Sequence, residues 1–149
     1  MASNDTPKTI DLWGVGVQNE AAVTDAVVTP GMLLARTAGG VRPHNVAGGT
    51  ASPAFAVENE WIGGTISDNY AIGENCYFRT FAQGSAVYAI LAASQTISVG
   101  DLLQSNGAGA LIEASTADNV VARALEAVTT TGATARIRAE IVTGYTSAV

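Results

Sequence analysis

The chain uses one motif twice, first as Val28-Thr29-Pro30-Gly31-Met32-Leu33-Leu34 and again as Ile97-Ser98-Val99-Gly100-Asp101-Leu102-Leu103. A glycine-rich stretch follows each copy, Gly39-Gly40 after the first and Asn106-Gly107-Ala108-Gly109 after the second. A β-branched approach, a leucine pair and a glycine turn are typical of a β-hairpin, because the turn residues fix the register of the two strands. The repeat therefore predicts two hairpins.

Strand signals recur along the rest of the chain. The segment 136–141 alternates charged residues with Ile137, Ala139 and Ile141, which is the pattern of a strand with one buried face. The β-rich segments 76–81 and 85–91 flank a Gln83-Gly84 turn and predict a further hairpin. Residues 119–128 fit either a helix or a strand, and the short turn that links them to the last strand favours a strand.

The spacing of these strands decides the fold class. Strands about every 8 to 12 residues, separated by glycine turns, are typical of antiparallel barrels and sandwiches. We therefore expect an all-β fold, a small antiparallel β-barrel or sandwich with glycine-rich hairpins and an extended N-terminal arm. The arm covers residues 1–27 and the β-barrel domain covers residues 28–149.

The arm has two features of its own. Trp13, Val15 and Val17 alternate with other residues, as in an extended segment, and glycines separate them. Such a segment is either an arm that becomes ordered on another surface or an ordinary first strand. Asn19 to Ala26 predicts a short helix, with Asn19 as its N-cap.

Composition favours an assembly of copies. The 149 residues include 27 alanines, against 35 leucine, isoleucine, valine and phenylalanine residues together. A domain with few large apolar side chains gains stability by burying surface against copies of itself, so we expect a homo-oligomer.

Charge excludes one class of partner. The formal net charge of -6 argues against nucleic-acid binding, which requires clustered basic residues. Six of the seven basic residues are arginine, which suits contacts between subunits, and we select Arg36 and Arg42 for that role. A high-GC genome is the alternative explanation for this excess of arginine over lysine.

Targeting and redox signals are sparse. The first residues carry no apolar signal segment, and no stretch has the roughly 18 apolar residues of a membrane span, so we expect a soluble cytosolic product without membrane contact. Cys76 is the single cysteine, which leaves no intramolecular disulfide.

Catalytic residues are equally sparse. His44 is the sole histidine and follows Arg42-Pro43, where a loop or strand-edge position is expected. The sequence contains no metal-binding motif, no phosphate loop and no dinucleotide fingerprint. We therefore expect no enzyme, no catalytic residue, no cofactor and no metal.

Residues 59–76 form a long excursion between strands. Glycine, asparagine and aspartate interrupt it, and we expect its large apolar side chains to anchor it to the body of the domain. These side chains are Trp61, Ile62, Ile66, Tyr70 and Ile72. Long irregular segments in compact domains usually form contacts or carry function.

The order of several segments resembles a known family. The set of segments is similar to the head decoration (capsid cement) proteins of tailed bacteriophages. Its main part is Gly84–Ala93, then Ile97–Leu103, Val121–Ala127 and Arg136–Arg138. Upstream, it includes Thr29-Pro30-Gly31, Pro43-His44 and Ala56–Asn59. The resemblance covers about residues 28 to 142.

This resemblance implies a function and a set of partners. It implies a β-rich virion subunit, often a homotrimer, that binds the outer surface of the expanded capsid, clamps neighbouring major capsid proteins and stabilises the shell. Residues 28–149 are then the decoration domain, located on the capsid exterior and, during assembly, in the host cytoplasm. The N-terminal arm engages the shell in such proteins.

The resemblance also selects contact residues and leaves alternatives. We expect Ile10, Leu12 and Trp13 to contact the capsid, and Trp61, Arg36 and Arg42 to lie in capsid or subunit interfaces. A carbohydrate-binding module would instead use a flat aromatic platform of Trp13, Trp61 and Tyr70. Two further hypotheses remain: a tail or fibre component of the virion, and an enzyme that uses His44.

Overall fold

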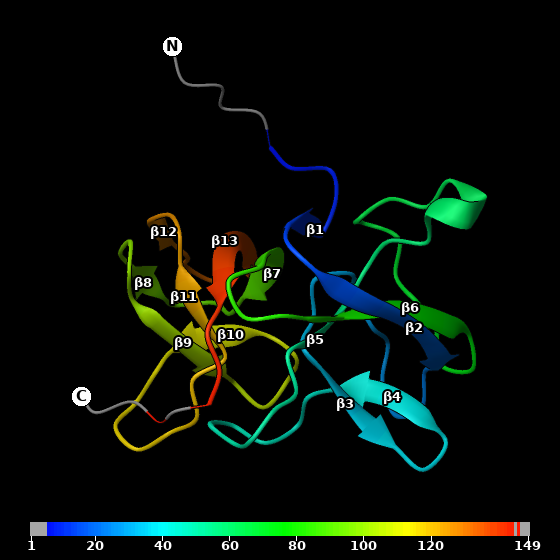
Figure 1. Cartoon of the computed structure of the whole chain (residues 1–149), viewed down its shortest axis with the longest axis horizontal. Helices are drawn as coiled ribbons and strands as arrows, with labels where there is room; N and C mark the ends of the chain where they lie inside the picture. Colours follow the sequence, from blue (N-terminus) through cyan, green and yellow to red (C-terminus); the bar gives the residue numbers. More distant parts are fainter. Residues whose placement is uncertain (1–5, 145, 147–149) are drawn as a thin grey trace.

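The computed structural model describes residues 6–144 and residue 146. Within that part of the chain it contains β-strands, one 3-10 turn, η1 (Glu60–Ile62), and no α-helix, which confirms the all-β expectation (Figure 1). The strands are β1 (Asp11–Trp13), β2 (Gly16–Ala22), β3 (Leu34–Thr37), β4 (Gly40–Pro43), β5 (Ala54–Ala56), β6 (Asn75–Phe81), β7 (Ala86–Leu91), β8 (Thr96–Ile97), β9 (Leu102–Ser105), β10 (Leu111–Glu113), β11 (Ala122–Ala124), β12 (Val128–Thr129) and β13 (Ala135–Ile141).

Five strands close into a barrel. They follow one another in the order β7, β10, β9, β11 and β13, and β13 pairs with β7 to complete the ring. All neighbours are antiparallel except β10 and β7, which are parallel where Leu111 faces Leu91. Closure removes the free edges that an open sheet of these strands would expose.

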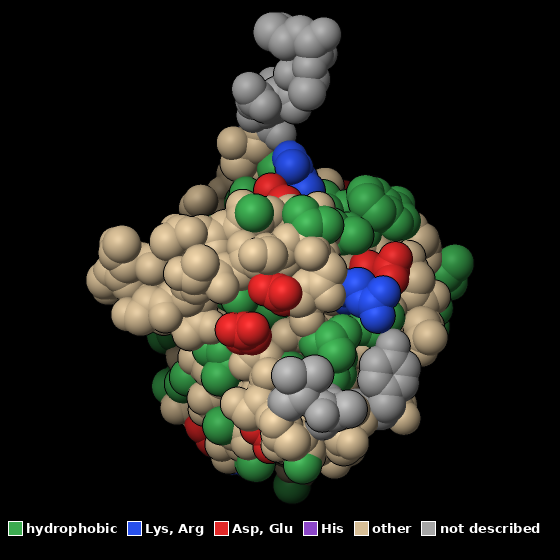
Figure 2. All heavy atoms as spheres, turned by 90° about the vertical axis from the view of Figure 1, so that its left-hand side faces the viewer, with side chains coloured by type: hydrophobic (Ala, Val, Ile, Leu, Met, Phe, Trp, Pro, Cys, Tyr) green, Lys and Arg blue, Asp and Glu red, His purple; other side chains and the backbone are tan. Residues whose placement is uncertain are grey.

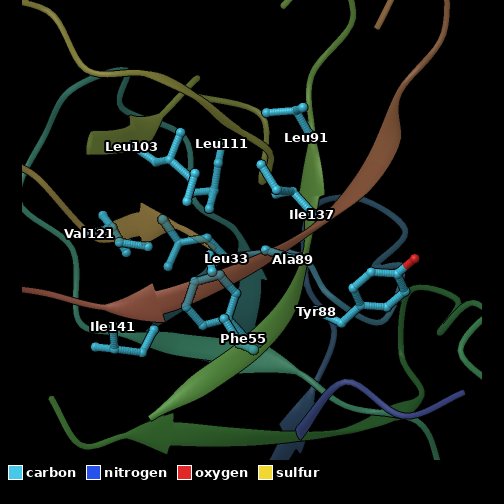
Figure 3. Packing of buried hydrophobic residues seen from close by; sticks show 14 of the residues in the cluster. Leu33, Phe55, Tyr88, Ala89, Leu91, Leu103, Leu111, Val121, Ile137 and Ile141 are labelled. Carbon is cyan, nitrogen blue, oxygen red and sulfur yellow. The ribbon is translucent and has the colours of Figure 1, made fainter. Parts of the chain in front are cut away.

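The burial of β13 and β7 follows from their places in the barrel. Ile137, Ala139 and Ile141 are buried at alternate positions of β13, as the sequence predicts. All six residues of β7 are buried, because its outer face is covered as well as its inner face. Figure 3 shows this arrangement, with Ala89 directed into the core and Tyr88 directed to the opposite side of the strand.

Both hairpins predicted from the repeated motif are present. The first joins β3 to β4, with Leu34 opposite Pro43. The second joins β9 to β10, and in its turn the Asn106 side-chain oxygen accepts hydrogen bonds from the backbone N–H groups of Ala108 and Ala110, at 2.7 and 3.0 Å. Segment 119–128 contributes β11 and the start of β12 rather than a helix, as expected.

The predicted hairpin between segments 76–81 and 85–91 is wrong, although both segments are strands. β6 pairs with β2 and β5, whereas β7 belongs to the barrel. The turn between them redirects the chain: the N–H of Ser85 donates to the carbonyl of Ala82 (3.1 Å), and the N–H of Gly84 donates to the carbonyl of Ile141 (3.0 Å). Gly84 has a φ of 89°, which favours glycine.

The predicted helix at Asn19–Ala26 is also wrong. Residues 16–22 form β2, which pairs with the whole of β6 from Gly16 opposite Phe81 to Ala22 opposite Asn75. The long β6 backbone offers hydrogen-bond partners that override a weak local helix preference. β1 pairs antiparallel with β7, so described residues of the expected arm contribute to both sheets. The division into an arm and a domain stays a prediction.

Two hydrophobic cores lie on the two faces of the β2–β6–β5 sheet. The first fills the barrel and includes Phe55 and Phe81 from this sheet, together with Leu33 and Ile10. Figure 3 shows Leu33 and Phe55 next to the barrel side chains Leu103, Leu111, Val121, Ile137 and Ile141. The second core lies under the β3–β4 hairpin and includes Phe78, Cys76, Leu34 and Val41. The shared sheet therefore connects the barrel to the hairpin.

Replacing a buried and an exposed isoleucine tests the position of the barrel core. Ile137→Ala removes side-chain atoms from the fully buried interior and is expected to lower the free energy of unfolding by about 2–5 kcal/mol. Ile62→Ala deletes the same atoms at an exposed position, and the expected change is below about 0.5 kcal/mol. Urea denaturation measures both values, and equal losses would contradict this core.

Candidate functional site

Several large exposed apolar side chains lie on two segments of the chain, while Val27, Val46 and Val99 are exposed elsewhere. Trp13, Val15 and Val17 lie in β1, in the β1–β2 connection and in β2. Trp61 and Ile62 lie in η1, within the loop between β5 and β6. The Trp13 side chain is 55% exposed and that of Trp61 is 74% exposed, so both indoles are available for contact with another molecule. In Figure 1, β1 and the 3-10 turn lie in the upper half of the molecule, and β2 runs from there across its middle.

The loop between β5 and β6 is anchored by two of the five residues expected, Tyr70 and Ile66. Trp61, Ile62 and Ile72 are exposed and do not anchor it, contrary to the sequence prediction. Tyr70 is buried in the second core, and its hydroxyl donates a 2.6 Å hydrogen bond to the carbonyl of Val57. Burial raises the pKa of the Tyr70 hydroxyl well above its usual range. Ile66 packs against the first core.

Arg136 is an anchor that the sequence did not reveal. Its Nη1 donates to the carbonyl of Pro30 (2.7 Å), and its Nη2 donates to the carbonyl of Ile66 (2.6 Å). Its guanidinium lies 5.8 Å from the centre of the Tyr88 ring. Partial burial lowers the pKa of Arg136. The alternating pattern of β13 placed this arginine on a solvated face, but here it joins two loops to the barrel.

The N-terminal strands are tied to the body by polar contacts. Arg79 pairs with the carboxylate of Asp11 (2.6 Å) and donates to the side-chain oxygen of Gln18 (3.0 Å). The carboxylate of Glu58 accepts a hydrogen bond from the N–H of Ile10 (3.1 Å). These contacts hold β1 and β2 against the sheet, which fixes the position of the exposed Trp13.

The six candidate contact residues therefore have different surroundings. Ile10 is fully buried in the first core, and Leu12 packs against that core. Trp13 ends β1 and Trp61 lies in η1, both exposed, whereas Arg36 and Arg42 lie on the β3–β4 hairpin, which is at the bottom of Figure 1 while β1 is in its upper half. The structure does not bring the tryptophans and the arginines together. A role for any of the six in an interface stays a prediction.

The two arginines make contacts within their own chain. The guanidinium of Arg36 lies 5.1 Å from the centre of the Phe78 ring. Arg42 pairs with Asp25 at 2.8 Å, near the surface, where ion pairs contribute little to stability.

His44 is held by hydrogen bonds and is buried rather than placed at an open edge. Its Nε2 lies 3.1 Å from the carbonyl oxygen of Thr50, so we assign the ring proton to this nitrogen, because a carbonyl only accepts. Its Nδ1 then accepts a hydrogen bond from the Ser105 hydroxyl (2.7 Å), and the oxygen of that hydroxyl accepts from the N–H of Gly107. The cleft beside His44 is lined by Leu34, Ala35, Arg36, Val41, Asn45, Val46, Thr50, Ala51, Ser52, Ala54 and Phe78, with no carboxylate among them. This arrangement supports a structural role for the imidazole.

Other reactive groups are separated or inert. Burial raises the pKa of the Cys76 thiol to about 12, which suppresses its nucleophilic thiolate form. Within residues 6–144, no three His, Cys, Asp or Glu side chains are grouped so as to hold a metal ion. No helix in the described part of the chain has the length and apolarity to cross a membrane. Figure 2 shows the barrel side, on which Lys and Arg side chains lie at separate places and apolar side chains are scattered.

Comparison with solved structures found a similar fold in a phage protein. The structure is the head fiber gp8.5 N base of bacteriophage phi29, with a TM-score of 0.58 and 16% sequence identity. The match covers 86% of this chain and 95% of that chain. No protein-family model matches the chain, and no curated protein matches its sequence. At this identity, the likeness shows a shared fold.

Replacing Arg136 tests its role as the anchor of the β5–β6 loop. Arg136→Ala removes both hydrogen bonds to loop carbonyls and is expected to lower the free energy of unfolding by about 1–3 kcal/mol. Amide hydrogen exchange around Ile66 should become faster, while exchange in β9 and β11 should not change.

Arg123→Ala, at an exposed position of β11, is the matched control and should change neither quantity. Equal hydrogen exchange around Ile66 in the Arg136→Ala variant and the unmodified protein would show that Arg136 does not hold the loop.

Proposed function

We propose that this chain is a structural protein of a phage virion, one that binds the outer surface of the expanded head. In this proposal it stabilises the shell by clamping neighbouring major capsid proteins. The single observation that carries the proposal is the fold shared with a phage head fiber base over 86% of this chain. The order of sequence segments that resembles capsid decoration proteins supports the same assignment.

The exposed tryptophans suit a protein that works by adhesion. Tryptophan is enriched among the side chains that dominate binding energies, because it buries a large apolar area together with one hydrogen-bond donor. Trp13 lies on a strand tied to the barrel, and Trp61 lies on a loop held by Tyr70 and Arg136. Because both side chains are held on an ordered framework, less conformational entropy is lost on binding.

Energetics are consistent with a clamp. A contact that buries about 1,000–2,000 Å² is sufficient for specific attachment. A subunit that binds only the expanded lattice stabilises that lattice through mass action, and the effect adds over many copies. A net charge of -6 on each subunit would oppose aggregation of the coated particles.

A second candidate is the base of a fibre attached to the head. The head fiber identity of the structural neighbour, of which 95% is covered, favours this candidate. Both candidates place the protein on the outside of a head, but they differ in what the bound chain does there. A clamp stabilises the lattice by contacting neighbouring capsid proteins, whereas a fibre base serves to attach a fibre.

The two hypotheses outside the virion, a carbohydrate-binding module and an enzyme, receive less support from the structure. Tyr70 is buried, which removes one of the three rings of the carbohydrate platform. Both nitrogens of His44 contact the chain itself, and its cleft has no carboxylate lining, so the acid–base pair required by the enzyme reading is not assembled there.

Binding to bare expanded heads tests the proposal. The purified chain should sediment with heads and raise the temperature at which they open. A rise in that temperature would support the clamp, and binding without a rise would support the fibre base. A chain that stays in the supernatant at every concentration would overturn both candidates.

Removing the Trp13 indole tests the proposed contact surface. Trp13→Ala is expected to weaken head binding about tenfold or more, because truncation of an interface tryptophan commonly costs about 2 kcal/mol. The far-ultraviolet circular dichroism should not change, since the side chain is exposed. Val46→Ala, at an exposed position in the loop after β4, is the control and should bind like the unmodified chain. Unchanged affinity of Trp13→Ala would exclude Trp13 from the contact.

A further inference from the structure

One side of β2 has hydrogen-bonding groups without partners in the described chain. Toward β6, the carbonyl of Val15 accepts from the N–H of Ala82, and Val23 exchanges two bonds with Glu74 and Gly73, all at 2.8 Å. The pairing with β6 has no shift of register between Gly16 and Ala22. Bonding direction alternates along an antiparallel strand, so Val17 and Asn19 also face β6. Gly16, Gln18 and Glu20 therefore direct their N–H and C=O groups away from the sheet.

The other edges around this position are covered. Beyond Ala22 the chain lies against β4, where the N–H of Thr24 donates to the carbonyl of Val41 (2.9 Å). At the opposite edge of the sheet, Ala56 of β5 bonds to Gly31 and Met32. Among residues 6–144, no element pairs with residues 16–20 on their outer side. The open edge is thus a defined stretch of five residues.

This stretch carries one charged residue, Glu20 at its end, but lacks the other devices that usually prevent edge pairing. It contains no proline, no lysine and no bulge, and Val17 within it is 65% exposed. Natural proteins commonly block exposed edges with such features, because an unblocked edge pairs with another chain.

We propose that β2 pairs with β2 of a second copy, antiparallel, about a two-fold axis through Val17. Gly16 then exchanges two backbone hydrogen bonds with the partner's Gln18, and Gln18 exchanges two with the partner's Gly16. Val17 faces the partner's Val17 as a non-hydrogen-bonded pair, in which the side chains approach most closely. The two sheets join into one of six strands, within the usual size range.

The edge itself argues for a second copy as its occupant. Under the two-fold axis, every outward donor of Gly16 and Gln18 meets an acceptor of the same edge. The two Glu20 carboxylates are then six residue positions apart, about 20 Å at 3.4 Å per residue, beyond the screening length of physiological salt. A register centred on Gln18 would place Val17 opposite asparagine and lose the apolar pair. This pairing does not depend on the proposed function, since it involves this chain alone.

The mass of the chain in solution tests the pairing. Light scattering of the full chain is expected to give twice the mass of one chain, which is 15.1 kDa. Gln18→Pro removes an outward N–H that has no partner in the described monomer, and it should halve the measured mass while the circular dichroism is kept. Gln18→Ala loses the same side-chain contact with Arg79 but keeps the N–H, so it should remain a dimer.

A cysteine at the two-fold axis provides an independent readout. Val17→Cys should form a disulfide-linked dimer under mild oxidation, since Cys76 is buried and the new thiol is exposed. Val27→Cys, at an exposed position outside β2, is the control and should remain unlinked. If Gln18→Pro fails to fold, the Val17→Cys result decides.

Three results would overturn the pairing. They are a monomer at every concentration of the unmodified chain, an oligomer that persists in folded Gln18→Pro, and a Val17→Cys chain that crosslinks no more than Val27→Cys. A trimer that keeps its mass in Gln18→Pro would overturn the dimer in favour of the trimer that the family resemblance implies.

Discussion

The pairing of β13 with β7 is the contact on which the rest of the structure depends. It runs from Ala135 opposite Leu91 to Glu140 opposite Ala86 and closes the barrel. The ring is complete because β10, β9 and β11 link the other edges of β7 and β13 in that order. β13 also carries Arg136, which binds the loops at Pro30 and Ile66. The contact that closes the barrel therefore also helps to position the loop that carries Trp61.

In this architecture the packed barrel core is separate from the exposed segments that could bind another protein. Large apolar side chains fill the barrel, and Leu33 and Phe55 extend the same core into the neighbouring sheet. The buried groups that could react are held in the structure. Both ring nitrogens of His44 form hydrogen bonds within the chain, and burial raises the pKa of the Cys76 thiol. The exposed tryptophans lie on segments that the body holds in place. A chain of this kind is suited to contribute binding free energy to a larger particle, which is the basis of the function that we propose.

The sequence predicted the elements whose signal is local. Alternation identified β13, because one of its faces is buried and the other is half-buried, and turn residues identified the hairpins at Gly39 and Asn106. The separation of β6 and β7 into different sheets was missed, because the Gly84 turn joins two sheets and no local pattern distinguishes such a turn from that of a hairpin. β2 was missed because an edge strand exposed on both faces has no apolar period. The contacts of Arg136 and the exposure of Trp61 depend on loops that meet only in the folded chain, so no local signal could reveal them.

Cryo-electron microscopy of expanded heads incubated with the chain tests the central claim most directly, namely that the protein acts by adhesion to the outside of a shell. We predict added density on the outer surface, with the fold of Figure 1 and with the side that carries Trp13 and Trp61 facing the capsid proteins. Heads without added density would contradict the claim. Density in which both tryptophans face solvent would contradict the contact surface.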